Sequence, residues 1–305
     1  MSWFVANLAA PMTASSASSG RSPAMTFLRR TFAILTLVAV VAVVAPSPAG
    51  AEPTWAPADT AAIQPGAMTY TAGAQCTANF VFFAATDVYI GQAAHCSGTG
   101  GSTETNGCSA GSLPLGTSVQ VDGADQPGTL VYNSWLAMQA NGETDASTCQ
   151  YNDFALVRLD PRDVAKVNPT IPVWGGPVAL GTSTAAGEDV FSYGNSSLRL
   201  GVSQLSPKVG TSLGQDVDGW THTVYTLTPG IPGDSGSAFL NSAGEAIGVL
   251  STIAIAPLPA SNGVGDLASA LDYLATRTDF GPLELALGTE AFDGDATKVL
   301  TSLVG

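Results

Sequence analysis

The stretch Pro232-Gly233-Asp234-Ser235-Gly236-Ser237 decides which fold and which chemistry are expected of this 305-residue chain. A serine nucleophile needs its hydroxyl on a tight, exposed turn, with backbone N–H groups facing the position where an oxyanion forms. Gly233 and Gly236 meet that need, because glycine adopts positive φ and lets a substrate approach the backbone closely. The same residue types also form ordinary turns, so the stretch by itself leaves a plain surface loop open.

Two other segments carry the residue types that would complete such a site. His95 lies in Gln92-Ala93-Ala94-His95-Cys96, directly after the strand-like run 87–91. Asp153 begins the apolar run 153–159. A carboxylate at the head of a buried strand can hold an imidazole in the tautomer that accepts a serine proton. The histidine, the aspartate and Ser235 follow one another at spacings of 58 and 82 positions.

These three segments resemble the motifs of the chymotrypsin-like (trypsin-fold) serine proteases of the secreted bacterial type. In that family Ala-Ala-His-Cys carries the base, an Asp before an aliphatic strand carries the orienting acid, and Gly-Asp-Ser-Gly carries the nucleophile. The resemblance covers about residues 63–278. It implies that His95, Asp153 and Ser235 are catalytic and that the N–H groups of Gly233 and Ser235 form the oxyanion hole.

The resemblance implies an all-β fold of two antiparallel six-stranded β-barrels with a C-terminal helix. Short apolar runs separated by turn residues agree with it, and they predict a first barrel over about 63–165 and a second over about 166–265. The site would then lie in the cleft between the barrels. Helical spacing, with Asp266 as N-cap, predicts a helix over about 266–277. Its apolar face consists of Leu267, Ala270, Leu271 and Leu274.

The N-terminal 51 residues have the pattern of a secretory signal peptide. Arginines precede a 15-residue apolar run, Thr31 to Ala45, and small residues end at Ala51. The run is shorter than the roughly 20 apolar residues of a membrane span. Because Met25 begins a compact signal by itself, we expect it to be the true start. The mature protein is therefore predicted to be extracellular, with 52–62 as a flexible lead or short propeptide.

Composition narrows the choice of partners. With ten basic and 24 acidic residues the net charge is −14, and removing a leader that holds three arginines and no acid leaves −17. Nucleic acids and anionic membranes need a basic face, so neither is an expected partner. We expect a monomer that acts on a protein or peptide substrate without a cofactor or metal. Asp293-Gly294-Asp295 is too short for a calcium loop, and the extension 279–305 is expected to serve core packing.

Four cysteines in a secreted chain indicate two disulfides, and the count alone allows three pairings. The resemblance favours Cys76–Cys96, because the cysteine after the base histidine usually pairs with one on the preceding strand. Cys108–Cys149 is then the second bridge.

The resemblance also places a specificity pocket beside Ser235. Its residues would be Ile231, Ser251, Thr252, Ile253 and Gly263. The segment 228–231, which would form the base of this pocket, offers no carboxylate for a lysine or arginine, and Ile253 stands where relatives with larger pockets have glycine. We therefore expect a preference for small or medium apolar side chains before the scissile bond.

Several alternatives stay open at this stage. Zymogens of the family pair a freed N-terminal Ile or Val with the Asp before the serine, roles that Ile63 and Asp234 could take, whereas many bacterial relatives use an internal partner. The second histidine, His222, is expected to be a packed or solvated strand residue. An inactive binding protein of the same fold and an esterase with the same triad are the competing functions.

Overall fold

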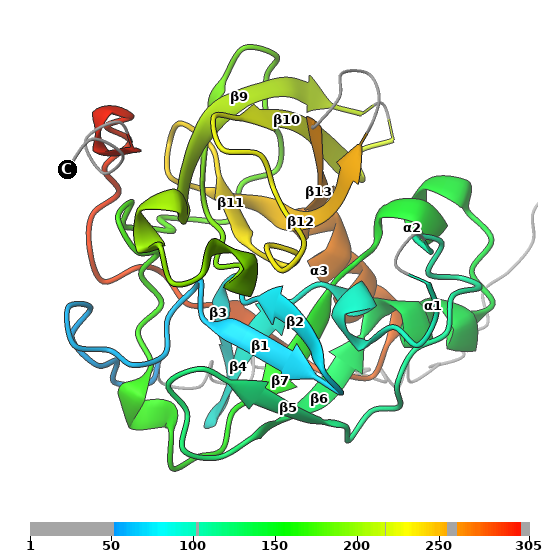
Figure 1. Cartoon of the computed structure of the whole chain (residues 1–305). Helices are drawn as coiled ribbons and strands as arrows, with labels where there is room; N and C mark the ends of the chain where they lie inside the picture. The colour runs from blue at the N-terminus through cyan, green and yellow to red at the C-terminus, as the bar shows by residue number, and fades with distance from the viewer. Residues whose placement is uncertain (1–51, 102–103, 217, 255–260, 300–305) are drawn as a thin grey trace, which may run out of the picture. The chain divides into compact units, whose positions relative to one another are not determined.

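A computed structural model describes residues 52–101, 104–216, 218–254 and 261–299, and two antiparallel β-sheets form the frame of this part of the chain (Figure 1). The predicted all-β class is confirmed. The predicted signal peptide and the start at Met25 lie outside the described residues. Within those residues, no helix combines the length and the apolar character that crossing a membrane requires.

The first sheet has eight strands in the order β14-β3-β4-β7-β6-β5-β1-β2, where a six-stranded barrel is expected. Its strands are β1 (Met68–Thr71), β2 (Ala74–Thr77), β3 (Val81–Ala84), β4 (Asp87–Gln92), β5 (Ser118–Val121), β6 (Gly128–Asn133), β7 (Ala155–Arg158) and β14 (Glu284–Leu285). The last of these comes from the C-terminal extension. Glu284 and Leu285 pair with Phe83 and Phe82, so the extension covers an edge of β3 that would otherwise expose unpaired backbone groups.

The second sheet is a closed six-stranded barrel with the order β10-β13-β12-β11-β8-β9. Its strands are β8 (Asp189–Tyr193), β9 (Pro207–Gln215), β10 (Thr221–Thr226), β11 (Ala238–Leu240), β12 (Ala246–Ala254) and β13 (Ser261–Asp266). Its interior is packed with the buried side chains of Val190, Val224, Phe239, Ile247, Leu250 and Val264. Closure removes the free strand edges, so the turn that carries Ser235, between β10 and β11, is attached to a rigid frame.

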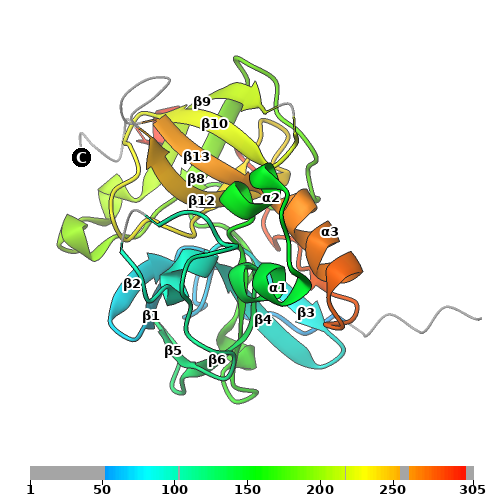
Figure 2. The same cartoon turned by 90° about the vertical axis from the view of Figure 1, so that its right-hand side faces the viewer.

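The described residues form three α-helices, which lie on one side of the two sheets (Figure 2). They are α1 (Ser134–Asn141), α2 (Ala146–Tyr151) and α3 (Leu267–Arg277). The C-terminal helix agrees with the sequence pattern: the Asp266 carboxylate accepts a hydrogen bond from the Ser269 N–H at 2.7 Å, and Leu267, Ala270 and Leu274 are buried. The other two helices had no clear periodic signal. The same part of the chain has four 3-10 helices: η1 (Ala94–Ser97), η2 (Val164–Lys166), η3 (Ser197–Arg199) and η4 (Ser203–Leu205).

Residues 52–62 make specific contacts with the segment 166–168 and with β3, which differs from the flexible lead that their composition predicts. The Ala56 N–H donates to the Val167 carbonyl at 2.9 Å, and the Asn168 side chain donates to the Ala56 carbonyl at 2.6 Å. The Trp55 ring lies edge-on to Phe83, with 6.3 Å between ring centroids. These bonds join segments about 110 positions apart, so no local sequence pattern announces them.

Both disulfides of the expected pairing are present. Cys76–Cys96 joins β2 to η1, and Cys108–Cys149 joins the loop after η1 to α2. Each bridge restricts the unfolded chain, which typically contributes about 2–4 kcal/mol to stability. The first bridge also fixes the 3-10 turn that carries His95 against β2.

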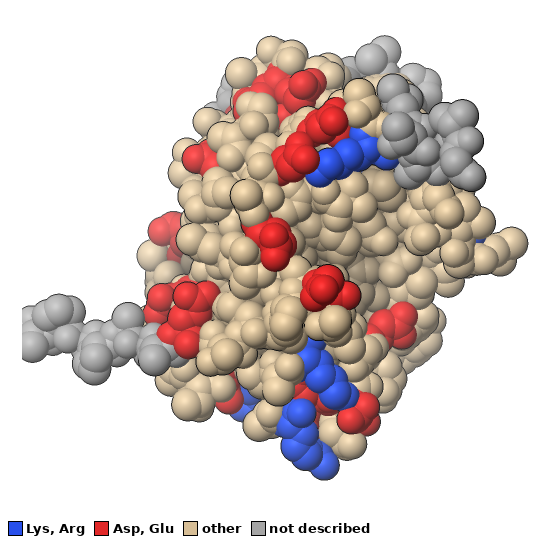
Figure 3. All heavy atoms as spheres, turned by 90° about the vertical axis from the view of Figure 1, so that its left-hand side faces the viewer, with Lys and Arg blue, Asp and Glu red and all other residues tan. Residues whose placement is uncertain are grey.

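Carboxylates outnumber basic groups on the surface, as Figure 3 shows for one face. Two basic side chains, Arg199 and Lys208, are instead buried in the second half of the chain. A buried cation needs an anionic partner, because removing a charge from water is costly. Both side chains pair with the carboxylate of Asp234, the residue before Ser235.

Candidate active site

The three segments of the expected triad meet at the junction of the two sheets. His95 lies on η1 after β4, Asp153 lies between α2 and β7, and Ser235 lies on the turn before β11. His95 and Ser235 line one cavity of about 640 Å³. Its walls come from both halves of the chain, with Gln75, Cys76 and Trp135 from the first and Leu250, Ser251 and Thr252 from the second.

Asp153 holds His95 at two points. Its carboxylate lies 2.6 Å from the imidazole Nδ1 through one oxygen and accepts the backbone N–H of His95 at 2.9 Å through the other. The Asp153 side chain is 4% exposed and that of His95 is 27% exposed, so the carboxylate lies behind the ring and the ring reaches the cavity. Because Nδ1 is occupied, Nε2 is the nitrogen left for chemistry.

A third side chain completes the support of this pair. The Ser251 hydroxyl donates to the Asp153 carboxylate at 2.5 Å, across 98 positions of sequence. Sequence reasoning assigned Ser251 only to the pocket wall, where it also lies. No sequence pattern indicates that Ser251 supports Asp153, because the contact joins β12 to the distant segment before β7.

The electrostatics of the pair favour its charged form. Burial opposes protonation of His95, but the Asp153 carboxylate and its hydrogen bond outweigh burial, so the pKa of His95 lies above its ordinary 6.5. Burial likewise opposes ionisation of Asp153, yet His95, Ser251 and the His95 N–H together hold the pKa of Asp153 below 3.8. The arrangement thus stabilises an imidazolium beside a carboxylate, which is what proton transfer to His95 would create.

Two glycines shape the turn around Ser235. Gly233 has φ +98° and Gly236 has φ +90°, conformations that side chains strongly disfavour. A Cβ on Gly236 would lie 2.5 Å from the Thr77 carbonyl oxygen and 2.9 Å from the Ala93 nitrogen. This close approach is available only to glycine, and it packs the serine turn directly against the segment that leads into His95.

The amides of Gly233 and Ser235 have no acceptor within the described residues, and both residues line the cavity. Two unbonded N–H groups beside a serine are what an oxyanion hole requires. No hydrogen bond joins the Ser235 hydroxyl to His95 in this part of the chain. Such bonds are often long in unliganded sites and shorten when substrate binds.

Asp234 is fully buried beneath the turn and faces two cations. Arg199 binds both carboxylate oxygens through its two terminal nitrogens, and the Lys208 Nζ lies 3.1 Å from one of them. Burial and, to a smaller extent, the Arg199 charge lower the pKa of Lys208. The Asp234 carboxylate raises this pKa, but not enough to offset them, so the pKa lies below its ordinary 10.5. Sequence reasoning left the partner of Asp234 open and identified neither cation.

Ile63 is the other candidate partner of Asp234, but its main-chain nitrogen is bonded elsewhere. Its N–H donates to the Lys166 carbonyl at 3.1 Å, and the residue forms a parallel bridge with Val167. Its side chain is buried in the core of the first sheet. The internal arrangement is therefore the one present in the structure.

Three of the five expected pocket residues line the cavity, namely Ile231, Ser251 and Thr252. Gly263 does not: it lies on β13 in register with Thr252, whose hydroxyl would be 2.4 Å from an added Cβ. The backbone of Ile253 lies on β12 opposite Asn262, and its side chain is outside the described part of the structure. Leu250, Pro232 and Trp135 line the cavity without having been expected there.

Cys76, Cys96 and His95 form a tight group within the described residues, with ligand atoms inside 4.8 Å of one another. The two sulfurs are joined in a disulfide and so offer no thiolates to a metal. The three residues lie close together because the disulfide attaches η1, which carries His95, to β2.

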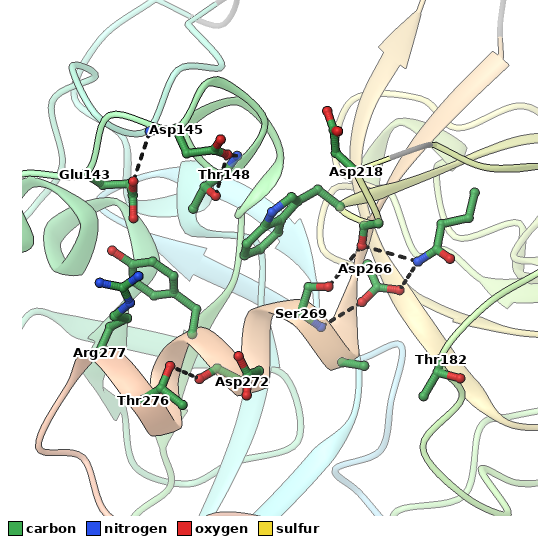
Figure 4. A pocket seen from close by; sticks show the side chains of 15 residues that line it. Glu143, Asp145, Thr148, Thr182, Asp218, Asp266, Ser269, Asp272, Thr276 and Arg277 are labelled. Carbon is green, nitrogen blue, oxygen red and sulfur yellow. Dashed lines mark hydrogen bonds between the residues drawn. The ribbon is translucent and has the colours of Figure 1, made fainter. Parts of the chain in front are cut away.

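The second histidine lies in a separate part of the molecule. His222 is fully buried on β10, with Nδ1 2.9 Å from the Thr184 hydroxyl and Nε2 2.9 Å from the Asp266 carboxylate. Asp266 also meets Gln215 and caps α3 at Ser269, beside a second hollow of about 860 Å³ (Figure 4). None of the triad residues lines that hollow, although five of its lining residues are acidic. His222 thus matches the packed strand histidine expected of it.

No family model and no curated protein matches the chain. It is similar to solved structures of proteases. Protease A of Thermobifida fusca is 18% identical, with a TM-score of 0.49 over 75% of this chain and 100% of that one. A glutamic-acid-specific serine protease is 17% identical, with a TM-score of 0.45 over 69% and 96% of the two chains. The protease NAPase of Nocardiopsis is 16% identical, with a TM-score of 0.43 over 73% and 98%.

Proposed function

We propose that the protein is a secreted serine endopeptidase that hydrolyses peptide bonds through an acyl-enzyme. One observation carries this proposal: Asp153 engages Nδ1 of His95, and the ring shares its cavity with Ser235 and two unbonded amides. Base, nucleophile and oxyanion donors are the three parts that acyl transfer needs.

The proposed reaction follows from these positions. The Ser235 hydroxyl attacks the carbonyl carbon of the scissile bond while Nε2 of His95 takes its proton. The negative charge moves to the carbonyl oxygen, where the N–H groups of Gly233 and Ser235 would bind it. His95 then gives its proton to the leaving amine, and water activated by the same ring releases the acyl group. Asp153 stabilises the imidazolium in both steps.

The internal cations at Asp234 favour an enzyme that needs no freed N-terminus. Arg199 and Lys208 already neutralise the carboxylate that a new amine would otherwise pair with. Moving Ile63 to Asp234 would also break its backbone bond to Lys166 and expose a core side chain. We therefore expect the chain from residue 52 to be active as secreted.

The cavity supports a preference for small or medium apolar residues before the scissile bond. Ile231 and Leu250 supply apolar surface beside Ser235, and Thr252 supplies a small polar rim. Among the described residues that line the cavity, the one carboxylate is that of Glu104, which comes from the loop after His95 rather than from the segment 228–231. A peptide-library profile dominated by cleavage after Lys or Arg would contradict this preference.

The decisive test treats the secreted chain and its Ser235→Ala variant with a tagged fluorophosphonate and then with casein. Labelling and casein cleavage that both vanish in the variant would establish a serine endopeptidase. Labelling with ester hydrolysis but no amide hydrolysis would favour the esterase. No labelling of the wild type would favour a binding protein of the same fold. N-terminal sequencing of the secreted protein would test release after Ala51.

A further inference from the structure

The carbonyl group just before the proposed oxyanion hole is held by a single side chain. The Ser196 hydroxyl donates to the Pro232 carbonyl oxygen at 2.5 Å. Ser196 is 1% exposed and does not line the catalytic cavity. Given the function proposed above, we infer that Ser196 is a positioning residue that directs the Gly233 N–H into the cleft.

The inference rests first on peptide geometry. The Pro232 carbonyl and the Gly233 N–H belong to one peptide unit, which is trans and nearly planar. The two groups of a trans peptide point in opposite directions. Holding the carbonyl toward Ser196, away from the substrate, therefore turns the N–H toward the cavity that Gly233 lines. If the peptide turned over, the carbonyl oxygen would face the oxyanion and repel it.

Glycine makes such a turnover accessible. Gly233 has φ +98°, and a residue without Cβ can adopt either peptide orientation at low cost. A Cβ there would lie 2.2 Å from the Gln75 Oε1 and 2.8 Å from the Ser196 Oγ, so the supporting side chains themselves exclude other residues. The orientation must consequently be specified by hydrogen bonds.

The peptide after Gly233 is specified several times over. The Gly233 carbonyl accepts from the Thr77 hydroxyl at 2.7 Å and from the Gln75 amide at 3.1 Å. The next N–H, that of Asp234, donates to the Ile231 carbonyl at 2.9 Å. The peptide before Gly233, in contrast, has only the Ser196 bond among the described residues. One hydroxyl therefore decides the direction of the proposed oxyanion donor.

Ser196 is itself held in place for this role. Its oxygen accepts the Leu198 N–H at 3.1 Å as the N-cap of η3, which leaves its proton for the Pro232 carbonyl. The adjoining residues fasten the same segment to the serine turn: the Ser197 N–H donates to Gln75, and Arg199 binds Asp234. The donor is thus pre-organised before any substrate arrives.

The test compares Ser196→Ala with Ser197→Ala in the secreted chain. Ser197 is the matched control, because it is exposed, its hydroxyl forms no hydrogen bond within the described residues, and alanine keeps its backbone bonds to Gln75 and Leu200. Losing one oxyanion donor lowers kcat by about 10²–10³-fold, so Ser196→Ala is expected to lower kcat at least tenfold with KM within about twofold. The Ki of a peptide trifluoromethyl ketone, which forms a tetrahedral oxyanion on Ser235, should rise by a similar factor. Ser197→Ala should change neither constant.

A second pair of variants separates positioning from folding. Ser196→Thr keeps the hydroxyl, whereas Ser196→Val has the same shape without it, and thermal unfolding monitors both. Recovery of kcat in the threonine variant alone would support the inference. A Ser196→Ala or Ser196→Val enzyme with wild-type kcat and ketone affinity would overturn it while leaving the protease proposal intact. A wild type that resists fluorophosphonate would instead remove the protease proposal and this inference with it.

Discussion

The molecule contains two histidine–aspartate pairs, His95–Asp153 and His222–Asp266, which differ in what surrounds the ring. The distances are similar, 2.6 Å and 2.9 Å between ring nitrogen and carboxylate oxygen. In each pair a hydroxyl also takes part: Ser251 binds the carboxylate of the first, and Thr184 binds the ring of the second. The residue types are therefore nearly the same.

The difference lies in the free ring nitrogen. His95 uses Nδ1 for Asp153, and Nε2 has no partner within the described residues, on a ring that is 27% exposed. His222 uses Nδ1 for Thr184 and Nε2 for Asp266, and its ring is fully buried. A ring with both nitrogens bonded and no solvent path cannot exchange a proton with a substrate. The two pairs thus differ in which group the hydroxyl binds. A hydroxyl on the carboxylate leaves one ring nitrogen available for proton transfer, whereas a hydroxyl on the ring occupies that nitrogen.

The largest effect should come from removing the proposed nucleophile of the first pair. Ser235→Ala is expected to lower kcat/KM by about 10⁶-fold, because loss of the attacking oxygen leaves only binding and the oxyanion donors. Steady-state hydrolysis of a peptide amide measures this. Ser237→Ala is the control, since its buried hydroxyl has no partner in the described part of the chain and should leave activity near wild type.

Exchanging each aspartate for asparagine sharpens the contrast between the pairs. Asp153→Asn should lower kcat by about 10⁴-fold, because the amide favours the wrong tautomer of His95 and does not stabilise the imidazolium. Asp266→Asn should leave kcat unchanged and lower only thermal stability. Equal losses of kcat in both variants would mean that the second pair takes part in catalysis.

The pH dependence of kcat/KM gives a further test of the role of Asp153. Activity requires neutral His95, and Asp153 raises the pKa of His95 above 6.5. The acid limb of kcat/KM should therefore have its midpoint above pH 6.5, with activity falling as the pH drops through it. In Asp153→Asn the carboxylate no longer opposes the effect of burial, so the midpoint of the residual activity should move to lower pH. An unmoved limb would show that another group controls it.

The next effect concerns stability rather than rate. His222→Ala should lower the free energy of unfolding by about 1–3 kcal/mol, because the buried Thr184 hydroxyl and Asp266 carboxylate would each lose a hydrogen bond to the ring, although Asp266 keeps Gln215 and Ser269 as partners. Denaturant unfolding followed by fluorescence measures the change. At a temperature where the variant is folded, kcat/KM should stay within twofold of the wild type; a large loss there would contradict the assignment of His222 to packing.

The smallest effect should come from the two hydroxyls. Ser251→Ala removes a hydrogen bond to a charged group, worth about 1.5–3 kcal/mol, and should lower kcat/KM about 10- to 100-fold. Thr184→Ala removes a comparable bond to His222 and should affect only stability, by about 1 kcal/mol. Parallel kinetics and unfolding curves for the two variants test whether hydroxyl position separates the pairs.

Sequence reasoning proposed His95, Asp153 and Ser235, which the structure brings together, because each lies in a short motif whose turn or strand chemistry is local. It also anticipated the all-β class, helix α3 with its Asp266 cap, and glycines at 233 and 236, since all depend on neighbours within a few positions. It did not find Ser251 as the partner of Asp153, nor Ser196 on the Pro232 carbonyl. Those contacts span 98 and 36 positions and leave no periodic signal.

The amino-acid sequence alone therefore determined which residues could perform the chemistry, because nucleophile, base and glycine turn are properties of short segments. Only the tertiary structure decided which histidine keeps a free nitrogen beside the serine, and which cations neutralise Asp234. It also decided that β14 joins the first sheet and that residues 52–62 bind to the segment 166–168. These outcomes depend on burial and on hydrogen bonds between distant strands, and both arise only when the chain folds.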